Sequence, residues 1–233
     1  MINIAIIPAR SGSKRIKNKN IINFCGKPMI YWPIKTLINS KIFNSVYVST
    51  DSLKIKQMAK KYGAQAPFLR PKNISTDSSS TIDVVKHLTK YLDNKKVKYD
   101  NICCVYPTSV FLKKSNIIKG YKKLLKENNQ LIFSANKIDS KFLRSFYHDK
   151  NKKKIKILFP KNIKKRTQDL REIYIDSAQF YWGTKKFWKQ SKEIINKNSS
   201  FIELNPDLIN DIDNLEDYEK AKIKFKKFFL NKK

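Results

Sequence analysis

Short apolar runs alternate with amphipathic stretches along the first half of the chain. A short continuous apolar run is typical of a buried strand, whereas apolar residues at every third or fourth position indicate a helix with one buried face. The runs that predict strands are residues 3–7, 45–50, 64–69, 101–106 and 131–135. The patterns that predict helices are residues 28–38, 53–62, 81–92 and 115–126. Strands that alternate with helices predict an α/β, Rossmann-like fold with a mainly parallel sheet flanked by helices.

This alternation stops between about residues 138 and 171. A lysine-rich turn at 149–154 separates two β-forming segments, 146–147 and 155–159, which predicts a β-hairpin inserted into the α/β fold. The α/β pattern then resumes with strands at 178–182 and 201–204 and a closing helix at about 215–228. A chain of 233 residues without internal repeats or a long linker suits one domain that carries this insertion.

The net charge of +31 is compatible with a nucleic-acid-binding protein. Only six of the 50 basic residues are arginines, however, and 44 are lysines spread over every segment. Proteins that bind phosphate backbones or bases rely on arginine, because its planar guanidinium binds two acceptors at once. We therefore interpret the lysines as solvated surface charge and expect no nucleic-acid partner. In such a chain an arginine suggests a position that needs a guanidinium, which directs attention to Arg10, Arg15, Arg70 and Arg166.

The chain carries no sequence signal for a membrane or for export. No stretch reaches the roughly 18 to 20 continuous apolar residues that a membrane-spanning helix requires. Residues 1–8 lack the charged region and the cleavage site of a signal peptide. Cys25, Cys103 and Cys104 lack the spacing of a zinc site or of a disulfide framework, and we expect them to be small buried side chains. These features predict a cytoplasmic protein without a membrane span.

The segment after the first predicted strand, residues 8–20 (PARSGSKRIKNKN), has the composition of an anion-binding loop. Its glycine permits backbone N–H groups to turn toward a ligand, and Ser13 adds a hydroxyl. Arg10, Lys14 and Lys19 supply positive charges that suit a triphosphate. Ligands of parallel sheets bind beyond the carboxyl ends of the strands, where this loop would lie. The segment matches neither a Walker A loop nor a dinucleotide fingerprint, and its composition alone is equally compatible with a basic surface loop.

The same segment resembles the opening signature of the CMP-sialic acid synthetases, cytidylyltransferases that act on acidic nine-carbon sugars. Further strings follow in the family's order over nearly the whole chain: GKP at 26–28, STD at 49–51, LRP at 69–71, YPTS at 106–109, RTQDL at 166–170, DSAQFYW at 176–182 and DID at 211–213. The RTQDL and QFYWG strings are most similar to the pseudaminic acid branch. The resemblance implies a Rossmann-like enzyme that transfers CMP from CTP to a nonulosonic acid, pseudaminic acid above all, and releases pyrophosphate. The product of such an enzyme supplies the glycosylation of surface polysaccharide or flagellin.

The resemblance also implies roles for individual residues. The triphosphate-binding positions of the family match Arg10, Lys14 and Lys19, with Ser13 in the same loop. The cytidine-binding positions match Asn20 and Arg70, and the loop that lines the base and ribose contains Ser79 and Thr81. The candidates for the sugar pocket are Tyr106, Thr108, Ser109, Gln168 and Gln179, with Arg166 for the sugar carboxylate or the released phosphates. In this family the inserted hairpin pairs two subunits, which implies a homodimer in which Arg166 acts in cis or in trans.

Asp211 and Asp213 form a candidate magnesium site. One residue separates them, so an extended backbone places both carboxylates on one side. Mg²⁺ takes oxygen ligands and shares them with substrate phosphates. Two aspartates at this spacing are by themselves more often a solvated acidic turn. In a chain with only 19 acidic residues that also carries the other strings of the family, we expect Mg²⁺ as the cofactor. The implied reaction is an in-line attack of the sugar's anomeric hydroxyl on the α-phosphorus of CTP, for which Asp211 or a metal-bound hydroxide is the candidate base. His87 and His148 are interpreted as structural or exposed residues.

Ile175 is the main departure from the pseudaminic acid pattern, because histidine is common at that position in the branch. The change leaves the sugar open: N-acetylneuraminic acid, legionaminic acid and the eight-carbon Kdo are alternative substrates for the same reaction. A basic nucleic-acid-binding protein and a non-catalytic dimeric scaffold are the alternatives of a different class. Neither of them needs Asp211 or Asp213, so loss of these carboxylates distinguishes them from the enzyme.

Overall fold

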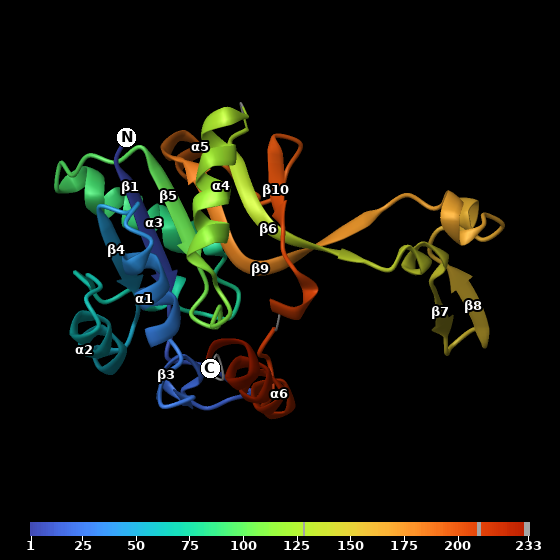
Figure 1. The fold of residues 1–233 in the computed structure, drawn as a ribbon, viewed down its shortest axis with the longest axis horizontal. Coiled ribbons are helices and arrows are strands. Elements are labelled where there is room, and N and C mark those ends of the chain that lie inside the picture. Colours follow the sequence, from blue (N-terminus) through green and yellow to red (C-terminus); the bar gives the residue numbers. More distant parts are fainter. Residues whose placement is uncertain (128, 209–210, 231–233) are drawn as a thin grey trace.

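Six strands form one central sheet in the computed structural model, which describes residues 1–127, 129–208 and 211–230 (Figure 1). In sheet order the strands are β10 (Ser199–Glu203), β6 (Leu131–Ile138), β9 (Ile173–Thr184), β5 (Asn101–Val105), β1 (Asn3–Pro8) and β4 (Ser45–Ser49). Neighbouring strands pair in parallel, except that β9 is antiparallel to both β5 and β6. The predicted α/β fold with a mostly parallel sheet is confirmed, and β9 makes the sheet mixed.

Helices cover both faces of the sheet. One core packs it against α1 (Tyr31–Asn39), α2 (Leu53–Lys61) and α4 (Lys114–Lys126), and the other against α3 (Thr81–Asn94) and α5 (Lys185–Gln190). Successive side chains of β5 alternate between the two cores: Cys103 belongs to the first and Cys104 to the second. Both are fully buried, as predicted, whereas Cys25 is only partly buried.

A third apolar cluster packs the C-terminal helix α6 (Leu215–Phe225) against the segment that follows β1. This segment contains the short strands β2 (Asn23–Phe24) and β3 (Lys27–Pro28), which pair with each other. The rings of Phe24 and Phe225 lie 5.2 Å apart, and Ile16 and Ile212 belong to the same cluster. In Figure 1, α6 lies beside β3. The residues just before α6 are thereby brought next to the loop that follows β1.

Side-chain caps fix the starts of α3 and α6. At α3, Ser80 accepts from the backbone N–H of Asp83, whose side chain accepts in return from the backbone of Ser80. Asn214 and Asp217 form the same reciprocal pair at α6. Each pair satisfies two N–H groups that would otherwise lack partners at a helix terminus. Of the helices in the described ranges, none is long and apolar enough to cross a membrane.

The strand predicted at residues 64–69 is wrong. Only Gln65 pairs with the sheet: its N–H donates to Val46 and its carbonyl accepts from Val48, both at 2.7 Å. Pro67 has no N–H to extend such a ladder, which accounts for the single bridge. The boundary of the first predicted helix also shifts, because the helix begins only at Tyr31.

β6 and β9 run beyond the edge of the sheet and carry a separate hairpin, which stands well away from the helices (Figure 1). These strands are longer than predicted, because residues 136–138 pair with residues 173–175 as an antiparallel ribbon. The hairpin consists of β7 (Phe146–Asp149) and β8 (Lys154–Ile157), joined by the lysine-rich turn. We call residues 139–172 the arm.

Candidate active site

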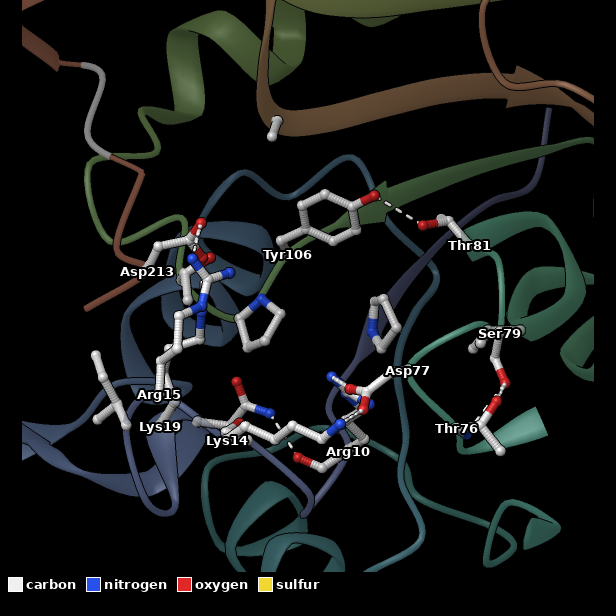
Figure 2. A pocket seen from close by; sticks show the side chains of 18 of the residues that line it. Arg10, Lys14, Arg15, Lys19, Thr76, Asp77, Ser79, Thr81, Tyr106 and Asp213 are labelled. Carbon is white, nitrogen blue, oxygen red and sulfur yellow. Dashed lines mark hydrogen bonds and ion pairs between the residues drawn. The ribbon is translucent and has the colours of Figure 1, made fainter. Parts of the chain in front are cut away.

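A cleft of about 650 Å³ opens at the carboxyl ends of β1 and β5 (Figure 2). Its walls come from the loop after β1, the loop before α3, the segment after β5 and the residues before α6. A parallel sheet offers a ligand site at this edge, so the position agrees with the one expected for the anion-binding loop. The predicted site residues that line the cleft are Arg10, Ser13, Lys14, Lys19, Asn20, Arg70, Ser79, Thr81, Tyr106, Thr108, Asp211 and Asp213.

Hydrogen bonds restrain the loop after β1. Ser11 donates through its backbone N–H and its hydroxyl to the two carboxylate oxygens of Asp51, both at 2.8 Å. Asn20 is only 5% exposed, and its Nδ2 donates to the carbonyl oxygen of Arg10 at 2.8 Å. The cationic side chains of this loop are therefore presented to the cleft by a fixed backbone.

Arg10 and Lys14 converge on Asp77, which lies in the loop before α3 (Figure 2). Lys14 Nζ lies 2.6 Å from Asp77 Oδ2, and the Arg10 guanidinium pairs with Oδ1. Hydrogen bonds from Lys14 and from Arg10 lower the pKa of Asp77 below its usual value. An ionised carboxylate thus lies between two cations that were predicted to bind a triphosphate.

Asp213 is also paired with two cations of the loop. Arg15 Nη1 lies 3.0 Å from Asp213 Oδ2, and Lys19 Nζ lies 3.4 Å from Oδ1. Lys19 Nζ also donates to the carbonyl oxygen of Ile212 at 2.8 Å. These contacts join the anion-binding loop to the segment before α6.

Asp211 and Asp213 have the chemistry of a magnesium site. Burial, and then the negative charge of Asp213, raise the pKa of Asp211 above its usual value, so a cation between the two carboxylates would be stabilising. Nowhere in the described ranges are three or more His, Cys, Asp or Glu side chains grouped to hold a metal. Two carboxylates still suit Mg²⁺, because this ion is usually held by one or two carboxylates together with substrate phosphates and water.

Arg70 places a buried guanidinium in the wall of the cleft. The residue is 5% exposed, and its Nε donates to Ser75 Oγ at 3.1 Å. Burial lowers the pKa of Arg70 below that of a free arginine. A buried guanidinium needs acceptors for its donors, and a ligand oxygen in the cleft would supply one. The contact between Arg70 and the cytidine stays a prediction from the sequence.

The hydroxyls predicted to lie beside the base and ribose make local hydrogen bonds. Ser79 Oγ accepts from the backbone N–H of Thr76 at 3.1 Å. Thr81 Oγ1 lies 2.7 Å from Tyr106 Oη, a contact that joins the start of α3 to the end of β5 (Figure 2). Burial raises the pKa of Tyr106 to about 12, so its hydroxyl remains protonated at neutral pH.

Tyr106 and Thr108 line the cleft itself, whereas Ser109 and Gln179 lie beside a small adjoining gap of about 20 Å³. Ser109 Oγ donates to the Gln179 carbonyl at 3.1 Å, and Gln179 Nε2 donates to the Leu208 carbonyl at 2.7 Å. The side-chain oxygen of Gln179 is buried and has no hydrogen-bond partner in the described part of the chain. This unpaired acceptor is suited to a ligand hydroxyl, although the gap beside it is too small for a whole sugar.

Arg166 and Gln168 lie in the arm, at the short 3-10 turn Thr167–Asp169, and do not line the cleft. Both are exposed, and the arm stands away from the sheet in Figure 1. One chain by itself therefore does not bring these two residues to the site. Ile175 is 53% exposed on β9 and does not line the cleft either.

Two charged residues that line the cleft, Arg15 and Asp77, had no role assigned from the sequence. Arg15 carried a weak signal as one of only six arginines. Asp77 belongs to the polar run STDSSST at 75–81, whose composition indicates a loop and nothing more. Its pairing with Arg10 joins segments that are distant along the chain and therefore leaves no local pattern.

Residues 4–232 match the cytidylyltransferase family. A pseudaminic acid cytidylyltransferase of Campylobacter jejuni is 40% identical over 226 residues, which cover 97% of this chain and 97% of that protein. A CMP-N,N'-diacetyllegionaminic acid synthase of Legionella pneumophila is 32% identical over 213 residues, which cover 90% of this chain and 87% of that protein. The solved structure of a CMP:2-keto-3-deoxy-manno-octonic acid synthetase complexed with CTP shares the fold, with a TM-score of 0.72, 14% identity, and coverage of 96% of this chain and 98% of that one. Because the family match spans nearly the whole sequence, the chain belongs to the cytidylyltransferase family.

Proposed function

We propose that this cytidylyltransferase transfers CMP from CTP to the anomeric hydroxyl of pseudaminic acid and releases pyrophosphate. One observation carries the proposal: a single cleft brings together four cations of one loop, Arg10, Lys14, Arg15 and Lys19, with the carboxylates of Asp211 and Asp213. The choice of sugar is supported by the relatives, since the protein that is 40% identical over 97% of its length is named for pseudaminic acid. The relative named for diacetyllegionaminic acid is less similar, at 32% identity.

The loop after β1 is assigned to the triphosphate. Arg10, Lys14 and Lys19 would hold the phosphate oxygens, and their positive charges would stabilise the charge that develops on the departing pyrophosphate. Asn20 supports this loop through its hydrogen bond to the Arg10 carbonyl. The buried guanidinium of Arg70 would bind the cytidine, with Ser79 and Thr81 beside the base and ribose.

Asp211 and Asp213 are assigned to Mg²⁺. When bound there, the ion would neutralise charge on the α-phosphate and on the leaving group. Asp213 is paired with Arg15 and Lys19, so coordination through its oxygens would release these cations for the phosphates. The metal site and the triphosphate site are therefore linked through one carboxylate.

In the proposed reaction, the anomeric oxygen forms a bond to the α-phosphorus as the bond to pyrophosphate breaks. Asp211, which lines the cleft, would accept the proton of the attacking hydroxyl. Tyr106 and Thr108 border the side of the cleft where the sugar would lie, and the unpaired oxygen of Gln179 is a further acceptor nearby.

The arm is assigned to the contact between two subunits of a homodimer. Phe142, Phe146 and Ile155 of the arm are each 59% exposed, which is apolar surface that a second arm could cover. In such a dimer Arg166 and Gln168 would reach the cleft of the neighbouring subunit, where Arg166 suits the sugar carboxylate.

Pyrophosphate release tests the reaction and the substrate together. The enzyme receives CTP and Mg²⁺ with pseudaminic acid, legionaminic acid, N-acetylneuraminic acid and Kdo in turn. We expect the highest kcat/KM with pseudaminic acid and no release by the Asp211→Ala variant. A higher kcat/KM with another of these sugars would contradict the substrate but not the reaction. No release with any sugar, from folded protein, would contradict the reaction itself.

A further inference from the structure

Each carboxylate oxygen of Asp77 pairs with a cation of the anion-binding loop. Lys14 Nζ lies 2.6 Å from Oδ2, and the Arg10 guanidinium pairs with Oδ1. The Asp77 side chain is 47% exposed and that of Arg10 is 33% exposed, so the contact lies at the surface of the cleft and is not locked in the core.

The loop that carries Asp77 has hydrogen bonds of its own. Thr76 Oγ1 lies 3.0 Å from Ser78 Oγ and 2.9 Å from Ser79 Oγ, and the Thr76 N–H donates to Ser79 Oγ at 3.1 Å. These contacts close the turn around Asp77 without using its carboxylate. The carboxylate can therefore be removed, or can leave the two cations, while the turn keeps its internal bonds.

The contacts of Asp77 are the contacts that a triphosphate would need. Arg10 and Lys14 are the cations assigned to the phosphates. The Asp77 carboxylate is negatively charged, as a phosphate is, and accepts hydrogen bonds from the same donors. A phosphate group placed on these cations beside an ionised carboxylate would meet like-charge repulsion. Binding of the phosphates and the present position of Asp77 are thus mutually unfavourable.

We propose that Asp77 is an internal counter-ion that competes with the phosphates of the ligand for Arg10 and Lys14, and thereby sets the affinity of the enzyme for CTP and pyrophosphate. The inference rests on the proposed role of these two cations in triphosphate binding. Each binding event exchanges the Asp77 carboxylate for a phosphate, and each release of pyrophosphate is assisted by the return of Asp77. A ligand that does not use Arg10 or Lys14 does not displace Asp77.

The test measures direct binding of three probes to Asp77→Asn and to the wild type, in Mg²⁺ and without sugar, by titration calorimetry. The probes are CTP, pyrophosphate and uncharged cytidine. We expect the variant to bind CTP and pyrophosphate about three- to tenfold more tightly, the scale of one or two exposed ion pairs, with no change for cytidine. Inhibition of the forward reaction by pyrophosphate should strengthen by the same factor. Asp77→Ser should change affinity in the same direction.

Asp93 provides a matched control on another part of the surface. Its carboxylate lies between two lysines, 2.8 Å from Lys189 Nζ and 3.3 Å from Lys185 Nζ, and its side chain is 32% exposed. Asp93→Asn and Asp77→Asn therefore make the same change. Each removes one negative charge that lies between two cations. We expect it to leave the affinity for CTP unchanged.

Several results would overturn the proposal. Unchanged binding of CTP and pyrophosphate by Asp77→Asn would show that Asp77 does not compete with the ligand. Weaker binding would show that Asp77 positions Arg10 and Lys14 for the ligand. Equal tightening by Asp93→Asn would show a general effect of net charge, and equal tightening of cytidine would show an effect on the base loop. In each of these cases the wild type still binds CTP, so the proposed function stands. Failure of the wild type to bind both CTP and pyrophosphate would overturn the proposed function and this inference together.

Discussion

The side chain of Asn20 donates a 2.8 Å hydrogen bond from Nδ2 to the carbonyl oxygen of Arg10. This bond joins the two ends of the loop that presents the cations of the cleft. Asn20 is 5% exposed, so water cannot easily replace the lost partner when either group is changed. We therefore expect the buried side-chain amide of Asn20 to support nucleotide binding by holding the loop in the conformation that presents its cations to the cleft.

Asn20→Ala should reduce both stability and nucleotide binding. Loss of a buried hydrogen bond, with the Arg10 carbonyl left unpaired, should lower the free energy of unfolding by about 1–3 kcal/mol. Displacement of the loop cations should weaken CTP binding by about ten- to a hundredfold, because small shifts of binding groups are costly. Urea unfolding and titration calorimetry measure the two effects separately.

Asn101 supplies the matched control for this variant. It is also 5% exposed, and its Nδ2 donates to Asn3 Oδ1 at 3.1 Å, at the far ends of β5 and β1 from the cleft. Asn101→Ala should lower stability by a similar amount and leave the affinity for CTP unchanged. Loss of CTP affinity in both variants would show that instability alone weakens binding, contrary to the role given to Asn20.

Asp211→Asn and Asp213→Asn should each lower kcat/KM by about a hundredfold or more, because each removes a charged ligand of the proposed metal. The variants should also need more Mg²⁺ for half-maximal activity. Asp207→Asn is the control, since Asp207 is an exposed carboxylate shortly before Asp211 that does not line the cleft. Activity that falls equally in the Asp207 variant, or an unchanged requirement for Mg²⁺, would contradict the metal site.

His87 should make the protein sensitive to acid. Burial, and then the positive charges of Arg70 and Lys90, lower the pKa of His87, whose ring packs 4.6 Å from that of Phe68. The unfolded chain then binds the proton more tightly than the folded one, so the contribution of His87 to stability is complete above the unfolded value of about 6.5. It is lost as the pH falls from that value through the folded pKa.

His87→Phe keeps an aromatic ring at this position and removes the titration. Between pH 7.5 and pH 5, the free energy of unfolding should fall less steeply in the variant than in the wild type. The difference cannot exceed about 1.4 kcal/mol per pH unit, the limit for one proton. Urea unfolding across this range measures it. Parallel pH profiles for the two proteins would show that His87 does not titrate on unfolding, which would contradict its lowered pKa.

Local sequence patterns predicted most helices and strands well, because the formation of a helix or a strand depends mainly on residues that are close together in the sequence. The apolar run at 101–106 correctly placed Cys103 and Cys104 on opposite faces of a buried strand. The same reasoning failed at 64–69, where the residues have the composition of a strand but Pro67 prevents continued pairing. The direction of β9 left no local signal, because parallel and antiparallel strands use the same side-chain alternation.

The sequence predicted most of the residues that form the candidate site but not which of their side chains pair with each other. The cations of the first loop and the carboxylates of Asp211 and Asp213 were singled out from sequence, and the structure places them in one cleft. Their partners were not predictable, because the contacts of Lys14 with Asp77 and of Arg15 with Asp213 form only when distant segments meet. For Arg166 the sequence signal was clear, because the RTQDL string at 166–170 is distinctive. The structure nevertheless places Arg166 away from the cleft of its own chain.

Substitutions in the arm should separate the subunits of the proposed homodimer without unfolding the sheet. Phe146 and Ile155 are each 59% exposed. The double variant Phe146→Lys and Ile155→Lys replaces these apolar side chains with charged ones, so that burying the arm against a second subunit becomes unfavourable. Light scattering should then report a monomer, and circular dichroism should show that this monomer is folded. The pyrophosphate assay should show reduced release. Leu125→Lys, on an exposed apolar position of α4, should leave the dimer intact. A wild type that is itself monomeric would contradict the dimer directly.

Co-expression of two inactive variants then decides whether Arg166 acts on its own cleft or on that of the neighbour. A dimer of one Arg166→Ala chain and one Asp211→Ala chain contains one complete site only if the arm reaches across, because the cleft of the first chain then receives the intact Arg166 of the second. Random pairing would yield such dimers in half of the molecules, so activity should recover to about a quarter of the wild-type value. The arm substitutions should abolish this recovery. Without recovery in dimers shown to be mixed, Arg166 cannot complete the partner's site, and its exposed position in the arm would need another explanation.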